Sequence, residues 1–305
     1  MKYKALVIGC GNIGASYDLN TSGILTHAKA LSNKNLFELS FFDIDQNLSQ
    51  KIASTYNGFA LNDLNVSHLG HFDLVSICSP TAFHTTHLSI FLQLNTKVII
   101  CEKPVSLKSD ELEIILNLKK QSASHVLVNY IRRFQPAYIH LKSTYKTYFS
   151  LDDLKRVAIK YKRGFLNNAS HAFDLLEFLF DTPIHLEEVN IISSSVDAFA
   201  DDPTRTLTAR WNQAVVDVEG VPGIDPIWEC DLFFKNFRLR FVNSGNDISI
   251  LSAEGKVLFQ LNDGIKNYMS PVIDVAVKLL TSAEPAMTNF ESSLSLNKKM
   301  IQYIQ

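Results

Sequence analysis

Short, nearly continuous apolar runs recur through the N-terminal part of the chain and alternate with segments of helical spacing. The runs are rich in β-branched and aromatic residues, and they comprise Ala5–Ile8, Leu39–Phe42, Phe72–Cys78, Val98–Cys101 and His125–Tyr130. Such runs predict strands that are buried on both faces of a parallel sheet. Between the last two, Ser109–Lys120 places Leu112, Ile115 and Leu116 opposite charged residues, which is typical of an amphipathic helix. The pattern predicts a doubly wound α/β domain.

From about Lys155 onward strand-like runs recur, and many of them alternate between apolar and polar residues or are separated by Asn, Gly and Asp. This pattern predicts a mostly antiparallel sheet with one face exposed or covered by a partner. The expected strands are Arg156–Lys162, Glu188–Ser194, Thr204–Trp211, Ala214–Val221, Glu229–Phe234, Phe237–Val242, Asp247–Leu251 and Lys256–Leu261. Helices are expected at Asn168–Phe180, Val272–Leu280 and Ser292–Tyr303, with the C-terminal helical region packing back on the body of the protein. We therefore expect two domains, residues 1–125 and 126–305.

Length, charge and cysteine content narrow the class of protein. A chain of 305 residues has room for two domains, and its net charge of -2, from 29 basic and 31 acidic residues, creates no field that attracts nucleic acid or an anionic membrane. The cysteines are far apart and three lie in or beside apolar runs, as reduced core residues do; they are Cys10, Cys78, Cys101 and Cys230. No run approaches a membrane span or a signal peptide. We expect a cytoplasmic protein.

The first apolar run leads directly into GCGNIG, which places Gly9, Gly11 and Gly14 in the G-x-G-x-x-G spacing. The first glycine permits a tight turn, the second lets a pyrophosphate approach the backbone, and the third lets a helix pack on its strand. Together with Asn12 and Ile13, these residues predict a dinucleotide site in which the phosphates lie at a helix N-terminus.

The second run ends at Asp43, where such sites place an acid that binds the adenosine ribose. The interval from Gly14 is longer than the usual one of about 20 residues, which indicates an insertion near Ser16–Leu25 that could lie over the cofactor or the substrate. A carboxylate at position 43 repels the 2′-phosphate of NADP, so the sequence favours NAD. In the alternative interpretation Asp43 is only a turn residue.

Two further strand ends predict the nicotinamide side of this site. Ser79, Pro80, Thr81 and His84 follow the run that ends at Cys78. The segment Val98–Pro104, VIICEKP, then places Glu102 and Lys103 at the carboxyl end of a buried strand, where open α/β sheets bind ligands. His84 is equally consistent with a capping or surface role, and the charges of Glu102 and Lys103 with an ordinary strand exit that faces water.

The second domain has one polar row on an otherwise apolar helix. Asn167, His171 and Asp174 are spaced by four and then three residues, so they share one face of a helix beside an apolar stripe. The alternative is a helix cap followed by a buried histidine whose hydrogen-bonding groups are satisfied by neighbouring residues.

For Arg132 and Arg133 the sequence leaves open whether they contact substrate or cap structural elements.

Five motifs in this order resemble the Gfo/Idh/MocA oxidoreductases, a family that includes glucose-fructose oxidoreductase and inositol dehydrogenase. The motifs span nearly the whole chain: GCGNIG at Gly9–Gly14, DLVSICSPTAFH at Asp73–His84, CEKP at Cys101–Pro104, NYIRRFQP at Asn129–Pro136 and NNASHAFDLL at Asn167–Leu176. The resemblance implies an N-terminal Rossmann NAD-binding domain and a C-terminal α/β domain with an open, mostly antiparallel sheet. It also implies a homodimer or homotetramer formed through that sheet.

The resemblance further implies that Lys103 and His171 contact the reacting hydroxyl of a sugar-type substrate. Oxidising a secondary alcohol requires removal of its proton, and imidazole, with a reference pKa of about 6.5, suits that task. An ammonium group stabilises the developing alkoxide. Many relatives carry an aspartate where this chain has Asn167, and an amide orients a group but takes no proton. This difference shifts the expected substrate toward a sugar or sugar nucleotide.

The leading hypothesis is therefore an NAD-dependent dehydrogenase without a metal. One alternative is an NAD-dependent glycosidase that oxidises its substrate transiently and eliminates the aglycone, with no net NADH. The other is a regulator of the same fold that binds NAD(P) without turnover, and such a protein does not need both Lys103 and His171.

Overall fold

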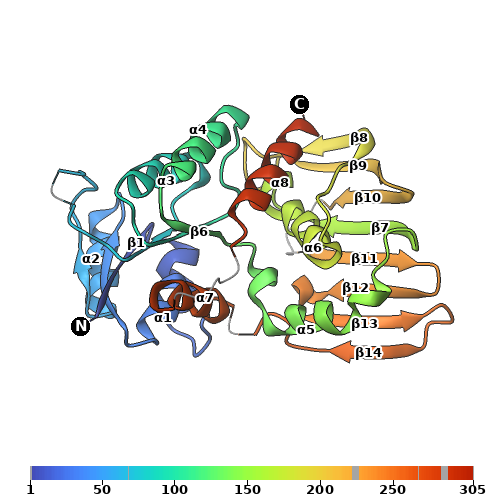
Figure 1. The fold of residues 1–305 in the computed structure, drawn as a ribbon, viewed down its shortest axis with the longest axis horizontal. Helices are drawn as coiled ribbons and strands as arrows, with labels where there is room; N and C mark the ends of the chain where they lie inside the picture. The colour runs from blue at the N-terminus through green and yellow to red at the C-terminus, as the bar shows by residue number, and fades with distance from the viewer. Residues whose placement is uncertain (1, 68, 222–226, 267, 283–287, 305) are drawn as a thin grey trace. The chain divides into compact units, whose positions relative to one another are not determined.

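Six parallel strands form the sheet of the N-terminal half in the computed structural model (Figure 1), which describes residues 2–67, 69–221, 227–266, 268–282 and 288–304. Their order is β3-β2-β1-β4-β5-β6. The bounds are β1 Tyr3–Ile8, β2 Phe37–Phe42, β3 Phe59–Ala60, β4 Leu74–Ile77, β5 Val98–Cys101 and β6 His125–Val128. The strand order reverses between β1 and β4, and at such a switch point an open α/β sheet binds its ligand.

Helices cover both faces of this sheet, which explains why the predicted strands are apolar throughout. Helices α3 and α4 pack side by side on one face, and α1 and α7 pack on the other (Figure 1). The bounds are α1 His27–Ser32, α2 Gln46–Thr55, α3 His84–Gln93, α4 Ser109–Lys120 and α7 Ser270–Thr281. The α4 helix matches its predicted range, while several strand ends differ by one to a few residues.

Eight strands form the second sheet in the order β14-β13-β12-β11-β7-β10-β9-β8. Only β7 and β10 are paired in parallel, so the prediction of an open, mostly antiparallel sheet is confirmed. The bounds are β7 Leu154–Tyr161, β8 Glu187–Ser195, β9 Thr204–Trp211, β10 Ala214–Gly220, β11 Trp228–Phe234, β12 Phe237–Val242, β13 Asp247–Ser252 and β14 Val257–Leu261.

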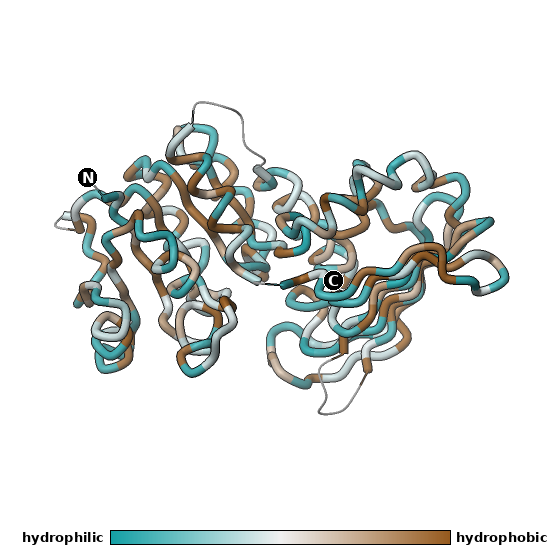
Figure 2. Tube along the Cα trace, turned by 90° about the horizontal axis from the view of Figure 1, so that it is seen from below, coloured by the Kyte–Doolittle hydropathy of each residue, from teal (hydrophilic) through white to brown (hydrophobic). Residues whose placement is uncertain are grey.

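Helices α5 (Pro136–Tyr145) and α6 (Ser170–Phe180) belong to the same half of the chain. Every residue of α6 except Phe180 is buried, so this helix forms the centre of the second core. Trp211 is buried against Phe180, with 5.3 Å between the ring centroids. Apolar residues are concentrated along the strands and inner helix faces, and polar residues along loops and outer turns (Figure 2).

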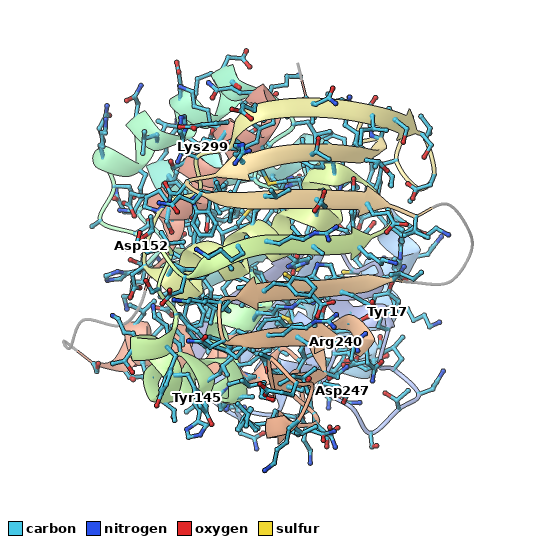
Figure 3. All side chains as sticks on the ribbon, turned by 90° about the vertical axis from the view of Figure 1, so that its right-hand side faces the viewer. Tyr17, Tyr145, Asp152, Arg240, Asp247 and Lys299 are labelled. Atoms are coloured by element: carbon cyan, nitrogen blue, oxygen red, sulfur yellow. The ribbon has the colours of Figure 1, made fainter. Side chains whose placement is uncertain are left out.

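The other face of the second sheet is charged. Cross-strand ion pairs join Arg156 to Asp217, Lys160 to Glu219 and Arg238 to Asp231. Arg240 and Asp247, labelled in Figure 3, lie on neighbouring strands. This alternation of apolar and charged positions is the one that the sequence predicted.

The chain divides into two compact units, Met1–Ile131 with Asn267–Leu294, and Arg132–Lys266 with Ser295–Gln305. The first crossing therefore follows Ile131, whereas the sequence placed it after residue 125, and α7 returns to the first unit. Helix α8 (Phe290–Gln302) contributes to both units. Among the described residues, no helix is both long and apolar enough to cross a membrane.

Candidate cofactor and active-site residues

The glycine turn follows β1 at the switch point, and each of its glycines has a different steric reason. A Cβ on Gly9, whose φ is +89°, would lie 2.7 Å from the backbone of Cys78. A Cβ on Gly14 would lie 1.9 Å from the carbonyl oxygen of Gly9. A Cβ on Gly11 would have no atom within 4 Å other than those of its chain neighbours. Two glycines thus allow the turn to close on β4, and the third leaves its backbone open to a ligand.

The segment after the turn corrects one sequence expectation. A regular helix was expected to begin there, but Asn12–Ser16 forms only a short π-helix. The N–H groups of Ala15 and Ser16 both donate to the carbonyl oxygen of Gly11, which widens this turn. Regular α-helix begins only at His27, after the predicted insertion.

The insertion is folded around a buried carboxylate. Asp18 accepts hydrogen bonds from the backbone N–H groups of Leu25 and Thr26 and from Thr26 Oγ1, at 2.6, 2.8 and 2.9 Å. Thr26 in turn caps α1 by accepting from the N–H of Lys29. Asp18 therefore fixes where α1 begins. Whether the loop covers a bound ligand stays a prediction.

Asp43 lies at the end of β2, beside the glycine turn. Its Oδ2 accepts from the N–H of Cys10 at 2.7 Å, and its Oδ1 accepts from the N–H of Asp45 at 2.9 Å. Both carboxylate oxygens are thereby fixed on the β2 side of the switch point. Burial raises the pKa of Cys10 to about 12, with Asp43 adding to the effect, so this thiol stays protonated.

On the other side of the switch point, Ser79, Pro80 and Thr81 follow β4 and lead into α3. The ring of His84 is buried, with Nδ1 2.8 Å from the carbonyl oxygen of Pro104 and Nε2 2.7 Å from that of Ser79. Burial lowers the pKa of His84 although both carbonyls oppose this. His84 thus joins the turns that follow β4 and β5, while its predicted contact with the cofactor stays a prediction.

Glu102, directly before Lys103, is held by two side chains, and one of them is itself held by β4. Its Oε1 accepts from His27 Nε2 of α1 at 2.9 Å and from Asn129 Nδ2 at 2.5 Å. Ser76 Oγ of β4 lies 2.5 Å from His27 Nδ1. These contacts lie within the first unit, and they fix the backbone that carries Lys103.

The charges of this cluster follow from its contacts. Burial lowers the pKa of His27, but Cys78 and Glu102 outweigh it and raise this pKa to about 10. Burial raises the pKa of Glu102, but hydrogen bonds from His27 and Asn129 hold it below its usual value. The cluster is therefore a buried ion pair. Sequence reasoning missed His27. The signal that could have found it is its position between Thr26 and Ala28, at the start of an apolar helix face, where a buried histidine needs a polar partner.

In the second unit, the segment before α6 carries Asn167 and leads to His171 one turn later. Residues Phe165–Ala169 form a π-helix that runs directly into α6. Asp202 accepts from the N–H groups of Leu166 and Asn167 and from Asn167 Nδ2, at 2.8, 2.8 and 2.9 Å. Asp202 was not predicted.

Asp174, one turn after His171, is paired with Arg133. Arg133 Nε donates to Asp174 Oδ1 at 2.7 Å, and its Nη2 lies 3.8 Å from Glu177. Burial raises the pKa of Asp174 to about 7, although Arg133 opposes this. Arg133 therefore anchors α6.

Arg132 also has structural contacts. Its guanidinium carbon lies 3.5 Å from the ring centroid of Trp228, a cation–π contact, and its Nη2 donates to the carbonyl oxygen of Ser244 at 2.7 Å. Both arginines thus have the structural contacts of one alternative, and a contact of either with substrate stays a prediction.

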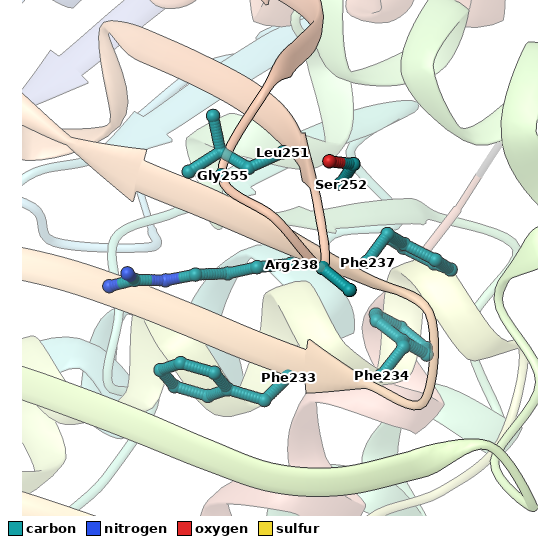
Figure 4. Close-up of a pocket in the computed structure, with 8 residues that line it drawn as sticks. Phe233, Phe234, Phe237, Arg238, Leu251, Ser252 and Gly255 are labelled. Carbon is teal, nitrogen blue, oxygen red and sulfur yellow. The ribbon is translucent and has the colours of Figure 1, made fainter.

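The first unit thus brings together all of the predicted cofactor residues along the carboxyl edge of its sheet, and the second places Asn167, His171 and Asp174 on successive turns. A pocket of about 360 Å³ lies elsewhere, at the ends of the β11–β12 and β13–β14 hairpins (Figure 4). None of the predicted site residues lines it. In the described part of the chain, no cluster of His, Cys, Asp or Glu is arranged to bind a metal.

Comparisons with known proteins agree with this arrangement. A family model described as "Oxidoreductase family, NAD-binding Rossmann fold" matches residues 3–130. The uncharacterized oxidoreductase YrbE of Bacillus subtilis is 24% identical over 229 residues, 70% of this chain and 64% of that protein. Inositol 2-dehydrogenase of Rhizobium meliloti is 26% identical over 137 residues, 45% of this chain and 38% of that protein. The chain thus spans less than two thirds of the length of these relatives.

Two solved structures share the fold over nearly the full chain. UDP-N-acetylglucosamine 3-dehydrogenase GnnA of Acidithiobacillus ferrooxidans has a TM-score of 0.76 at 15% identity, covering 99% of this chain and 96% of that one. The WlbA dehydrogenase of Bordetella pertussis, in complex with NADH and UDP-GlcNAcA, has a TM-score of 0.74 at 16% identity, covering 97% and 93%.

Proposed function

We propose that this chain is an NAD-dependent dehydrogenase acting on a secondary hydroxyl of a sugar or sugar nucleotide, since its residues 3–130 match the model of the oxidoreductase family with an NAD-binding Rossmann fold. The observation that carries the proposal is the position of Lys103. It lies two residues after the end of β5, on the side of the switch point opposite Asp43, which follows β2. A dinucleotide bound across the switch point has its adenosine near β2 and its nicotinamide toward β4 and β5.

The residues of the first unit fit a dinucleotide. Open space around Gly11 and the tight closure at Gly9 and Gly14 are what a pyrophosphate requires of its backbone. Asp43 would bind the adenosine ribose. Near the nicotinamide we place Ser79, Pro80, Thr81 and Lys103, while His84 and Glu102 support these turns.

The chemistry requires a hydride acceptor, which NAD supplies when bound. His171 takes the proton of the substrate hydroxyl as a general base. The ammonium group of Lys103 stabilises the negative charge that develops on that oxygen. Asn167 orients the substrate by hydrogen bonding, because an amide donates and accepts hydrogen bonds but takes no proton.

The sugar-type substrate is supported by the proteins that this chain resembles. Inositol 2-dehydrogenase, a UDP-N-acetylglucosamine 3-dehydrogenase and a dehydrogenase crystallised with UDP-GlcNAcA act on or bind cyclic polyols or sugar nucleotides, according to their names. We extend this substrate class to the present chain, without choosing the sugar or the carbon.

A substrate screen with a matched variant tests the proposal. Purified protein is incubated with NAD and a panel of sugars, polyols and UDP-sugars, and the absorbance of NADH is followed. We expect one class to give net NADH, and Lys103→Ala to lower turnover at least ~100-fold while NAD still binds. NAD binding without any turnover would favour the regulator, and product release without net NADH would favour the glycosidase.

NAD rather than NADP is the expected cofactor, because the fixed carboxylate of Asp43 repels a 2′-phosphate. Asp43→Ser should improve the ratio of NADP to NAD affinity at least ~10-fold, the effect of removing about 1.4 kcal/mol of repulsion. Cofactor titration of tryptophan fluorescence measures it. Asp45→Ser is the control, since Asp45 caps α2 and a serine also caps; an equal change in this variant would exclude Asp43 as the determinant.

We also propose that the open sheet of the second unit mediates a homodimer or homotetramer. Its charged face carries ion pairs, for example Arg156 with Asp217 and Lys160 with Glu219. Light scattering after size-exclusion chromatography measures the mass, and a monomer at micromolar concentration would contradict the proposal.

A further inference from the structure

The buried carboxylate of Asp202 contacts a residue of the proposed site, and its contacts exceed those of a helix cap. Asp202 is fully buried. One oxygen, Oδ1, accepts from the N–H of Leu166 at 2.8 Å. The other, Oδ2, accepts both from the N–H of Asn167 at 2.8 Å and from its side-chain Nδ2 at 2.9 Å. A cap needs only the backbone contacts, so the third bond is a specific one to the side chain.

The surrounding segment is shaped for this approach. A Cβ on Gly164 would lie 2.2 Å from Asp202 Oδ2, so only a glycine admits the carboxylate here. The N–H of Gly164 donates to Thr204 Oγ1 at 2.9 Å, and the N–H of Arg163 donates to Asp197 Oδ2 at 2.7 Å. Thr204 Oγ1 also donates to Asp197 Oδ2 at 2.8 Å. The segment of residues 163–167 is thus fixed by the one of residues 197–204.

The bond from Asn167 Nδ2 determines which way the amide points. A carboxylate has only acceptors, so it binds the NH₂ end of the amide and excludes the carbonyl end. The carbonyl Oδ1 therefore points away from Asp202. An aspartate at position 167, which is half-buried, would face the fully buried carboxylate of Asp202, and two like charges at this distance repel each other. Asp202 and an amide at position 167 thus require each other.

We propose that Asp202 is a positioning residue that holds Asn167 with its carbonyl oxygen presented as the hydrogen-bond acceptor for a substrate hydroxyl. The inference rests on the proposed function, because it assigns Asn167 to the substrate. Asp202 lies 35 positions from Asn167 in the sequence, and through Asn167 it determines how the site accepts hydroxyl groups.

An exchange of the two side chains tests the inference. Asp202→Asn places one amide against another and removes the fixed orientation, so we expect KM for the sugar substrate found in the screen to rise about 3- to 10-fold, the value of one lost hydrogen bond. Asn167→Asp creates two facing carboxylates and should raise KM at least as much. In the double variant Asn167→Asp/Asp202→Asn, the new amide donates to the new carboxylate, but its NH₂ group no longer accepts from the backbone N–H of residue 167, as Asp202 Oδ2 does. KM should therefore recover in part and lie below the KM of Asn167→Asp.

Asp201→Asn is the matched control, because Asp201 is the exposed neighbour of Asp202 and its substitution should change neither KM nor the unfolding temperature. A second readout is independent of turnover. The side-chain amide signal of Asn167 in a ¹⁵N spectrum, assigned by its loss in Asn167→Asp, should exchange slowly with solvent and should shift and exchange faster in Asp202→Asn.

The outcomes separate the two proposals. A protein that turns over no substrate contradicts the proposed function, while the amide signal still tests the pairing. An unchanged KM in folded Asp202→Asn, an unchanged amide signal, or a double variant no better than Asn167→Asp would overturn the role of Asp202.

Discussion

His27 and Glu102 show at the level of single residues how a buried charge is maintained. Each is removed from water, which costs several kcal/mol per ion unless the partner and further hydrogen bonds compensate. Glu102 has a second donor in Asn129, and the second nitrogen of His27 faces Ser76 Oγ. Because both ring nitrogens of His27 and the Oε1 atom of Glu102 have hydrogen-bond partners, the pair can persist beside Lys103 and hold its backbone.

The stability of the protein should depend on pH through His27. Its pKa is raised from 6.5 to about 10 in the folded state, so its contribution is complete below about pH 6.5 and is lost as the pH rises through 10. We expect stability to fall over this range with a slope of up to about 1.4 kcal/mol per pH unit from this one proton. His27→Gln should remove that part of the slope. Urea unfolding at intervals from pH 6.5 to 10 measures it.

His71→Gln is the control, because the His71 side chain is 62% exposed in its contact with Asp73. This variant should keep the alkaline slope of the original protein. Identical slopes for the original protein and His27→Gln would mean that His27 is not held as a cation.

At the level of elements, the glycine turn separates residues needed for folding from residues needed for binding. Gly14→Ala would place a methyl group 1.9 Å from the carbonyl oxygen of Gly9, so the backbone must move. We expect a loss of about 1–3 kcal/mol of stability, the usual cost of overpacking. Gly11→Ala meets nothing within 4 Å and Gly11 has a φ of -65°, so it should fold normally.

The same pair of variants should behave in the opposite way toward the cofactor. In Gly11→Ala the added methyl group occupies the space left for a pyrophosphate, so NAD affinity should fall at least ~10-fold with the unfolding temperature unchanged. Thermal unfolding with and without NAD measures both effects. Equal NAD affinity in Gly11→Ala and the original protein would show that the cofactor does not approach this turn.

The elements that sequence predicts well are those whose signal is local. Strands such as Val98–Cys101 are apolar along their whole length because both faces are buried, and Asp110 and Glu111 mark the start of α4. Gly9, Gly11 and Gly14 were predictable because the steric demand of a turn falls on adjacent residues. In contrast, the insertion interrupts the first helix, and nothing in its composition shows that Asp18 closes it.

His27 and Asp202 escaped prediction for a physical reason. Glu102 and His27 are 75 positions apart, and Asp202 and Asn167 are 35 positions apart. Neither pair has a periodic or motif signal, because their spacing depends on which strands and loops become neighbours after folding. The sequence alone therefore proposes which groups react, and the structure was needed to find what holds them.

At the scale of the whole molecule, each unit prepares one part of the proposed chemistry with its own buried carboxylate. In the first unit Glu102 fixes the turn that carries Lys103, and in the second Asp202 fixes the segment before His171. Each arrangement is complete within its unit. Each unit therefore holds its own group by contacts within that unit, and the proposed reaction needs both groups.

This division of the proposed chemistry between the two units predicts a specific result for a variant that lacks both Lys103 and His171. If Lys103 and His171 act on the same hydroxyl in one step, either substitution alone already abolishes that step. Removing the second group then costs little more, as is found for residues that act as a unit. We expect Lys103→Ala and His171→Ala each to lower turnover at least ~100-fold, and the double variant to lie within about 10-fold of the weaker single variant. Single-turnover rates with NAD and the identified substrate measure this. Fully multiplicative losses would mean that the two residues serve separate steps, and the shared hydroxyl would have to be abandoned.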